Sequence, residues 1–281
     1  MLGKKGFNNQ ITTYALLFIY SLFILVPVYI VLVSSFRTSE DVFKYMTPFT
    51  WRTLILTKIN FNAYIDIFKE INFGRSLFNS FFISIMSVFG GLVVNSMAGF
   101  AFAHFRFKGR DILFVIVLVT FMIPFESIAI PLYSFIRQLG LVNTYTGLIL
   151  PSIANGMIIF LFRQFFKGFP RALFESARID GASWFTIFYK IVLPISKPVI
   201  VSASILMLIL RWNEFFYPLL VGNSPEYRVV QVAISNFFTQ YQTKWNLLFA
   251  GVILAAIIPI LILLPLQRFF VQAVTGTGIK E

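Results

Sequence analysis

Six apolar runs, each long enough to cross a membrane as a helix, constrain the fold of this chain more than any other feature. About 20 apolar residues span the roughly 30 Å hydrocarbon core of a bilayer, and in lipid such runs must be helical to satisfy their own backbone groups. We therefore expect an all-α membrane protein in which residues 1–281 form a single transmembrane domain. The predicted spans cover about residues 11–35, 77–103, 112–135, 142–165, 198–221 and 247–271.

The composition supports a membrane protein and excludes several functional classes. Charged residues make up 12% of the chain, about half the share usual in soluble domains, and hydrophobic residues make up 58%. The formal net charge of +12 resides mainly in loops, so it indicates membrane topology and contact with lipid rather than a nucleic-acid partner. Because the chain has no cysteine and only His104, we expect no disulfide, no metal site, no catalytic residues and no cofactor bound by this chain.

The distribution of Lys and Arg predicts the topology. The first run is longer than the core of a signal peptide and lacks a small-residue cleavage site, so we expect it to remain as the first span. The short second loop and the fourth loop are densely basic, which places them and both termini in the cytoplasm of a multi-pass cell-membrane protein. The first loop is also basic, but its charges are spread over about forty residues and mixed with acids.

The second span has a face of small and polar residues at spacings of three or four: Ser80, Ser84, Ser87, Gly91, Asn95 and Ala98. Such a face either lets helices pack closely or lines a watery path. Several other spans contain proline, among them Pro124, Pro151 and Pro218, and we expect kinks there inside a helix bundle.

The fourth loop, at about residues 168–197, predicts a short helix from Arg171 to Ile179. Pro170 suits the start of a helix and Gly181 suits the left-handed position that ends one. A second helix is expected at about residues 182–191. The first helix would place Arg171, Glu175 and Arg178 on one face and Leu173, Phe174 and Ala177 on another. From this pattern alone it either rests on the membrane surface or inserts into a groove of a partner protein.

This loop resembles the EAA signature of bacterial ATP-binding-cassette (ABC) import permeases. The resemblance is carried by Glu175-Ser176-Ala177, Asp180-Gly181-Ala182, Ile191, Leu193-Pro194 and Pro198, with Ser176 in place of the usual alanine. It implies that a cytoplasmic coupling helix between spans four and five docks into a cleft of an ATP-hydrolysing subunit. The docking residues that it implies are Glu175, Ser176, Ala177, Arg178, Asp180, Gly181 and Ala182.

Segments outside the loop are similar to carbohydrate-type permeases of the maltose-permease class. They are Ile130 to Tyr133, Leu139 to Pro151, Trp212-Asn213-Glu214-Phe215 with Pro218 to Leu220, and Thr275 to Lys280. The resemblance implies import of a sugar, an oligosaccharide or a glycerol-phosphate-like solute. It also implies a heterodimer with a second permease subunit, an extracytoplasmic solute-binding protein and two ATPase subunits, which bind the ATP and Mg. This chain would be a translocation subunit and not itself an enzyme.

Ionisable residues inside the predicted spans are candidates for a translocation path, because charges are expensive in lipid. The charged candidates are Glu126, Arg211 and Glu214, and Asn213 is a further candidate because sugar hydroxyls bind such polar groups. Arg211 is expected to pair either with Glu126 at a similar depth or with Glu214 at i, i+3, unless these charges reach the outer interface. An ion-coupled secondary transporter is the rival class, which predicts paired broken helices in two related halves or a ring of carboxylates; the sequence shows neither clearly.

Overall fold

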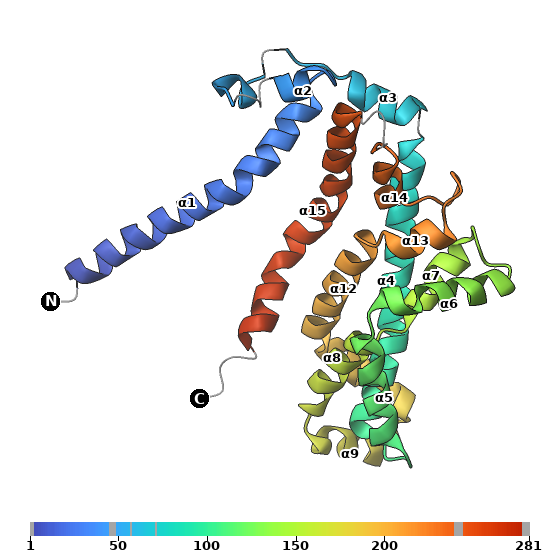
Figure 1. Cartoon of the computed structure of the whole chain (residues 1–281). Coiled ribbons are helices and arrows are strands. Elements are labelled where there is room, and N and C mark those ends of the chain that lie inside the picture. Colours follow the sequence, from blue (N-terminus) through green and yellow to red (C-terminus); the bar gives the residue numbers. More distant parts are fainter. Residues whose placement is uncertain (1–2, 45–48, 57, 71, 239–243, 277–281) are drawn as a thin grey trace. The chain divides into compact units, whose positions relative to one another are not determined.

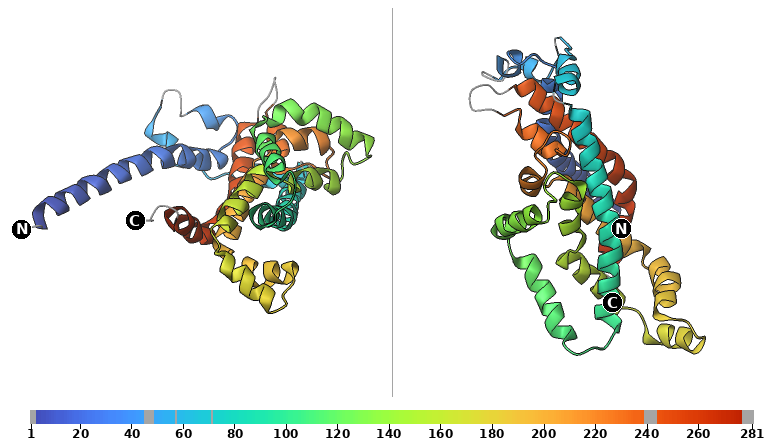
Figure 2. Two further views of the ribbon diagram at one scale, coloured as in Figure 1. Left: turned by 90° about the horizontal axis from the view of Figure 1, so that it is seen from below. Right: turned by 90° about the vertical axis from the view of Figure 1, so that its right-hand side faces the viewer.

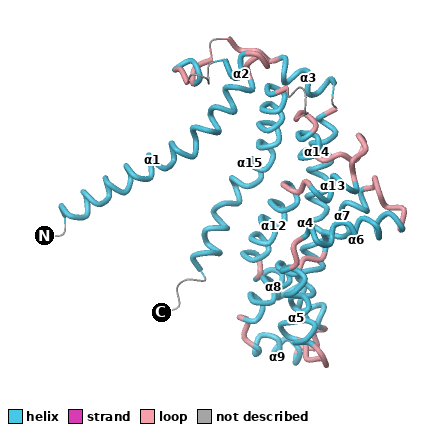
Figure 3. The backbone as a smooth tube through the Cα atoms, in the orientation of Figure 1, coloured by secondary structure: helices cyan, strands magenta, loops and turns pink. Residues whose placement is uncertain are grey.

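The computed structural model describes residues 3–44, 49–56, 58–70, 72–238 and 244–276 (Figure 1). Throughout this described part the regular structure is helical, as the all-α prediction requires (Figure 3). The contacts divide the chain into two compact units, Met1–Phe73 with Ala233–Ile257 and Gly74–Val232 with Ile258–Glu281. The chain ends that we predict to be cytoplasmic, residues 1–2 and 277–281, lie outside the described residues, as does most of the tail segment 275–280.

The first unit consists of a long apolar helix and a small extramembrane cluster. Its elements are α1 (Gly3–Ser35), α2 (Asp41–Lys44), a 3₁₀ turn (Trp51–Thr53), α3 (Asn62–Glu70) and the first part of α15 (Trp245–Gly276). Between Gln10 and Ser35 the apolar side chains of α1 are almost all exposed, as expected for a surface that lipid or a membrane partner covers. Beyond this helix, Phe36 packs against Phe61 and Tyr64, with ring centroids 5.5 and 5.1 Å apart.

The second unit is a bundle built around one long, unbroken helix, α4 (Phe73–His104). Shorter helices follow α4 along the chain (Figure 1): α5 (Arg110–Met122), α6 (Phe125–Gln138), α7 (Tyr145–Ile153), α8 (Gly156–Lys167), α9 (Arg171–Ile179), α10 (Trp184–Ile187), a π-helix (Phe188–Val192), α11 (Leu193–Ile195), α12 (Lys197–Trp212), α13 (Phe216–Val221) and α14 (Val230–Ser235). One buried core joins α4, α8, α9 and α12, and another joins α4, α6, α7 and α13. The helix α9 lies at the same end of this unit as the loop between α4 and α5 (Figure 2).

Three described helices are long and apolar enough to cross a membrane unaided, at Gln10–Ser35, Phe73–His104 and Trp245–Leu266. Three further pairs of helices reach that length only together, because each pair is bent at a short break. The bends are 101° between α5 and α6, 41° between α7 and α8, and 80° between Trp184–Ile195 and α12. The described chain is therefore a membrane protein with three continuous candidate spans and three broken ones.

Three predicted spans are each divided between separate helices. The fourth, at residues 142–165, is divided between Ile153, where α7 ends, and Gly156, where α8 begins. The third, at residues 112–135, was expected as one span with a kink at Pro124, but α5 ends at Met122 and α6 begins after Pro124. Proline favours an extended conformation at the residue before it, and Ile123 has a ψ of 122°, so the kink expected at Pro124 is a full break. The fifth was expected over residues 198–221, but α12 ends at Trp212 and the chain turns before α13 begins at Phe216.

The small face of α4 serves close packing. Ser80, Ser84, Ser87 and Asn95 are all less than 5% exposed. Glycine is needed where neighbours come closest, since a Cβ on Gly99 would lie 2.5 Å from the Cβ of Phe162 in α8. Of the two interpretations of this face, the structure supports helix packing rather than a watery path.

Candidate docking helix and membrane cavity

The helix α9 has the bounds that its end signals predict. Pro170 precedes the first turn with an extended backbone, which suits proline at the start of a helix. At the other end Gly181 has a φ of +80°, the N–H of Ala182 bonds to Ala177 O at 2.9 Å, and that of Gly181 bonds to Arg178 O at 3.1 Å. This pair of bonds is a Schellman motif, which satisfies the last carbonyls of a helix and favours glycine at the left-handed position.

One face of α9 is fixed to the bundle. Phe174 and Ala177 are 4% and 8% exposed and belong to the core that joins α4, α8 and α12. The ring of Phe174 lies 4.4 Å from that of His104 and 6.0 Å from that of Phe100, both in α4. Because Ala177 is buried here, its small side chain lets α9 sit close to the bundle and offers little surface to a partner.

The opposite face of α9 and the segment after it are exposed. Arg171, Glu175, Ser176, Arg178, Asp180 and Gly181 are accessible, and Ala182 is half-buried. Apolar side chains lie among them, with Ile179 86% exposed and Phe185 70% exposed. Arg178 donates to Ala182 O at 3.1 Å and lies over the ring of Trp184, which fixes the turn between the two helices. We call the exposed residues among 171–185 the docking surface, which excludes the buried Phe174 and Ala177.

The second helix of this loop begins later than predicted. Ser183 accepts a hydrogen bond from Thr186 N at 3.1 Å and caps α10, so the helix starts at Trp184 rather than at residue 182. The winding then changes to a π-helix at Phe188–Val192, which reaches past the predicted end at residue 191.

A cavity of about 260 Å³ lies where three helix breaks meet. Its lining comes from the α5–α6 break, the α7–α8 break and the α12–α13 break, and its polar members are Thr120, Ser152, Asn155, Arg211, Glu214 and Tyr217. Broken helices expose backbone groups and polar side chains at membrane depth, which lipid does not tolerate but a buried or water-lined cavity does. The cavity is therefore a polar site inside the apolar bundle.

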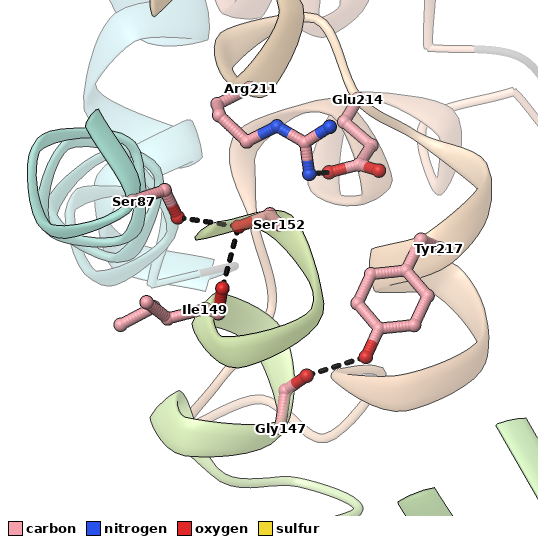
Figure 4. A network of polar contacts seen from close by, with 7 residues as sticks. All are labelled: Ser87, Gly147, Ile149, Ser152, Arg211, Glu214 and Tyr217. Carbon is pink, nitrogen blue, oxygen red and sulfur yellow. Dashed lines mark hydrogen bonds and ion pairs between the residues drawn. The ribbon is translucent and has the colours of Figure 1, made fainter. Parts of the chain in front are cut away.

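The charges in this cavity form an ion pair. Arg211 Nη1 lies 2.8 Å from Glu214 Oε2, and the two side chains are 18% and 17% exposed (Figure 4). Of the two pairings expected for Arg211, the structure contains the one within its own segment. In the described part of the chain, Glu126 is exposed and takes no part in an ion pair. Asn213 bonds to Ile209 O at 2.9 Å and does not line the cavity, so two of the four path candidates meet there and two do not.

Hydrogen bonds around the cavity hold its walls together. The Tyr217 hydroxyl donates to Gly147 O, which joins α13 to α7 (Figure 4). The Ser152 hydroxyl lies 2.9 Å from Ser87 Oγ and 2.6 Å from Ile149 O, which joins α7 to α4 (Figure 4). These contacts tie α7 to α13 on one side and to the long helix α4 on the other.

Asn95 clamps the α7–α8 break. Its side-chain amide donates to Ile153 O at 2.9 Å, and its Oδ1 accepts from Asn155 N at 2.9 Å. The break leaves these two backbone groups without helical partners, and one fully buried side chain satisfies both. Asn155 in turn caps α8 by accepting from Met157 N and Ile158 N.

Sequence reasoning missed several of these roles. Asn95 was read only as one of a set of small and polar residues, although a lone amide in an apolar span already signals a buried partner. Thr120, Ser152 and Asn155 are polar residues in apolar runs, close to Pro124 or Pro151. A polar residue at such a position is the sequence signal that could have identified them as cavity residues. Arg163, near the end of the predicted fourth span, is 8% exposed in α8, with its guanidinium 3.7 Å from the centroid of the Phe114 ring.

Comparison with known proteins gives a consistent family. The model of the family described as binding-protein-dependent transport system inner membrane component matches residues 91–276. The chain is 37% identical over 256 residues to the arabinooligosaccharides transport system permease protein of Halalkalibacterium halodurans, covering 90% of each. It is 32% identical over 281 residues to the sn-glycerol-3-phosphate transport system permease protein of Rhizobium meliloti, covering 99% of each. Its fold matches a chain of a bacterial ABC transporter involved in the import of the acidic polysaccharide alginate, with a TM-score of 0.80 over 95% of this chain and 98% of that one at 22% identity.

Proposed function

The chain belongs to the family of inner membrane components of binding-protein-dependent transport systems, and we propose that it is the permease subunit of an ABC importer for an oligosaccharide or a related sugar-like solute. The relative of highest identity reported above is named for arabinooligosaccharides, and another is named for sn-glycerol-3-phosphate, which supports a solute rich in hydroxyl groups. The chain is a transport component of the membrane. ATP hydrolysis belongs to two partner ATPase subunits, which bind the nucleotide and Mg.

The observation that carries the proposal is the construction of the docking surface. Its helix is fixed to the bundle on one face, ended by a Schellman motif at Gly181, and exposed on the other face with Ile179 and Phe185 at the surface. Two large apolar side chains, 86% and 70% exposed among polar residues of one short segment, are typical of a surface that a partner covers. We assign this surface to the ATPase, with Glu175, Ser176, Arg178, Asp180 and Gly181 at the rim.

The topology follows from this assignment. We propose that each bent pair of helices forms one span, which makes six spans in all and puts the α4–α5 loop, α9 and both termini on the cytoplasmic side. The loop between α13 and α14 then lies on the outer side, where a solute-binding protein delivers its cargo. A second permease subunit completes the path as a heterodimer.

The packing around α9 explains how ATPase closure reaches the membrane. A force on α9 passes through Phe174 and Ala177 into one core shared with α4, α8 and α12. Two of these helices, α8 and α12, adjoin helix breaks at the cavity. Closely packed cores favour a few discrete arrangements of the helices over continuous deformation. ATP and loaded binding protein then select one arrangement of the bundle and solute release selects the other.

The cavity is the part of the path that this chain contributes. Arg211 and Glu214 are kept in the apolar bundle as a pair, so their charges attract neither stray ions nor bulk water as strongly as single charges would. The Ser152 and Thr120 hydroxyls donate to carbonyls of their own helices, and Asn155 Oδ1 caps α8. The remaining hydroxyl lone pairs and the amide NH₂ of Asn155 can bond to sugar hydroxyls.

The test is co-purification from membranes of cells that express the whole importer. Ile179→Asp places a charge at the centre of the docking surface without touching the core, and Ile179→Leu is the matched control. We expect wild type and Ile179→Leu to carry the two ATPase subunits and the second permease, and Ile179→Asp to lose the ATPase while keeping the permease. Equal ATPase recovery with Ile179→Asp would remove the docking assignment.

A further inference from the structure

Two adjoining cavities open at the end of the second unit where α4 meets α5 and α9. One of about 560 Å³ is lined by Arg106, Phe107, Gly109, Arg110, Asp111, Ile112 and Arg171. The other, of about 360 Å³, shares Arg106, Arg110 and Arg171 and reaches back to His104, Trp184 and the carboxylate of Glu175. Arg106 and Arg110, which lie four residues apart, thus share one space with Arg171 from a distant part of the sequence.

The charge balance of the larger cavity is positive. Three guanidinium groups line it together with one carboxylate, that of Asp111, which already pairs with Arg110 at 3.0 Å. Within the described part of the chain, neither Arg106 nor Arg171 takes part in an ion pair. Planar guanidinium groups match the oxygens of a phosphate, to which they donate paired hydrogen bonds.

The apolar surroundings indicate a lipid rather than a soluble anion. Ile112 lines the cavity and is 70% exposed, and the same helix goes on to expose Val115, Ile116 and Val119. Phe107 at the cavity rim is also exposed. A basic pocket at the membrane end of an apolar helix fits a headgroup in the pocket and acyl chains along the helix.

We propose that Arg106, Arg110 and Arg171 bind the phosphate headgroup of an anionic phospholipid, whose acyl chains lie along α5. Because Arg171 begins α9, an occupied site links the lipid directly to the docking helix. The topology proposed above puts this lipid in the cytoplasmic leaflet of the membrane. Binding of the lipid itself does not depend on the proposed transport function.

The experiment uses the importer purified in detergent with phosphatidylglycerol and phosphatidylcholine at equal amounts, and counts retained lipids by native mass spectrometry. The test variant is Arg106→Gln with Arg171→Gln. The control is Lys190→Gln with Lys197→Gln, two exposed cations of the same loop outside both cavities, which gives the same change of charge. Arg106→Lys with Arg171→Lys retains the charge without the planar geometry.

We expect wild type and the control to prefer phosphatidylglycerol, and the glutamine variant to bind it about fivefold more weakly for each arginine removed. The lysine variant should lie between them. Wild type without a preference, or equal losses in the control and the glutamine variant, would overturn the proposal. Displacement of the lipid by millimolar inorganic phosphate would also overturn it, since the site would then hold a free anion. The same spectrum reports the subunits present, so failure of ATPase docking is seen separately from loss of lipid.

Discussion

Replacing Asn95 by leucine tests whether the α7–α8 break depends on one side chain. The change keeps the number and connectivity of side-chain heavy atoms and removes two hydrogen bonds between helices, those to Ile153 O and from Asn155 N. Hydrogen bonds between membrane helices contribute about 0.6 kcal/mol on average and about 1.7 kcal/mol at most. Two of them give roughly 1–3.5 kcal/mol, with the upper part of that range favoured because Asn95 is fully buried and both backbone groups lose their partner.

The assay is the free energy of unfolding in sodium dodecyl sulfate, followed by circular dichroism on the purified chain. Ser96→Ala is the matched control, because Ser96 is buried one residue further along and its hydroxyl bonds only to Val93 O of its own helix. We expect a loss of roughly 1–3.5 kcal/mol for Asn95→Leu and less than about 0.5 kcal/mol for Ser96→Ala. Equal values for the two variants would refute the clamp.

Three further variants test the packing, the ion pair and the helix end. Gly99→Ala should cost about 1–3 kcal/mol in the same unfolding assay, because its Cβ would meet Phe162 Cβ at 2.5 Å. Gly90→Ala is the control and should cost less, because its Cβ meets only the side chain of Ile153, at 3.2 Å. A larger cost for Gly90→Ala than for Gly99→Ala would contradict the packing. Glu214→Gln and Arg211→Gln should each lower the free energy of unfolding by roughly 3–5 kcal/mol, and the double variant should lower it by less than either. A double-mutant cycle measures this coupling, and additive losses would show that the pair does not interact. Gly181→Ala should strain the left-handed position by about 1–2 kcal/mol and weaken ATPase capture in a pull-down, while unchanged capture would show that the Schellman turn is not needed.

The short helix of the fourth loop could be predicted from sequence because its signals are local. Pro170 and Gly181 act through their own backbone preferences, so the bounds Arg171–Ile179 needed no tertiary information. The division of its surface also followed from the helical period, with Phe174 and Ala177 buried and Arg171, Glu175 and Arg178 exposed. Its docking role rests on resemblance and stays a prediction.

The broken spans could not be predicted from hydropathy, because hydropathy measures the length of an apolar run and not its direction. Residues 112–135 and 198–221 are apolar enough to span, yet the chain turns at Pro124 and at Asn213. A break at membrane depth is stable only when partners distant in sequence satisfy it, as Asn95 does for Ile153 and Asn155. For the same reason the choice of Glu214 over Glu126 as the partner of Arg211 needed the three-dimensional structure.

Solute uptake by the purified importer in sealed proteoliposomes tests the central claim most directly. The vesicles carry this chain with its partner subunits, and labelled arabinooligosaccharide is supplied with its binding protein on the outside. We predict uptake that requires ATP inside, requires the binding protein, persists when an ionophore collapses ion gradients, and is lost with Ile179→Asp. Uptake by this chain alone on an ion gradient, without ATP, would contradict the account and identify a secondary transporter.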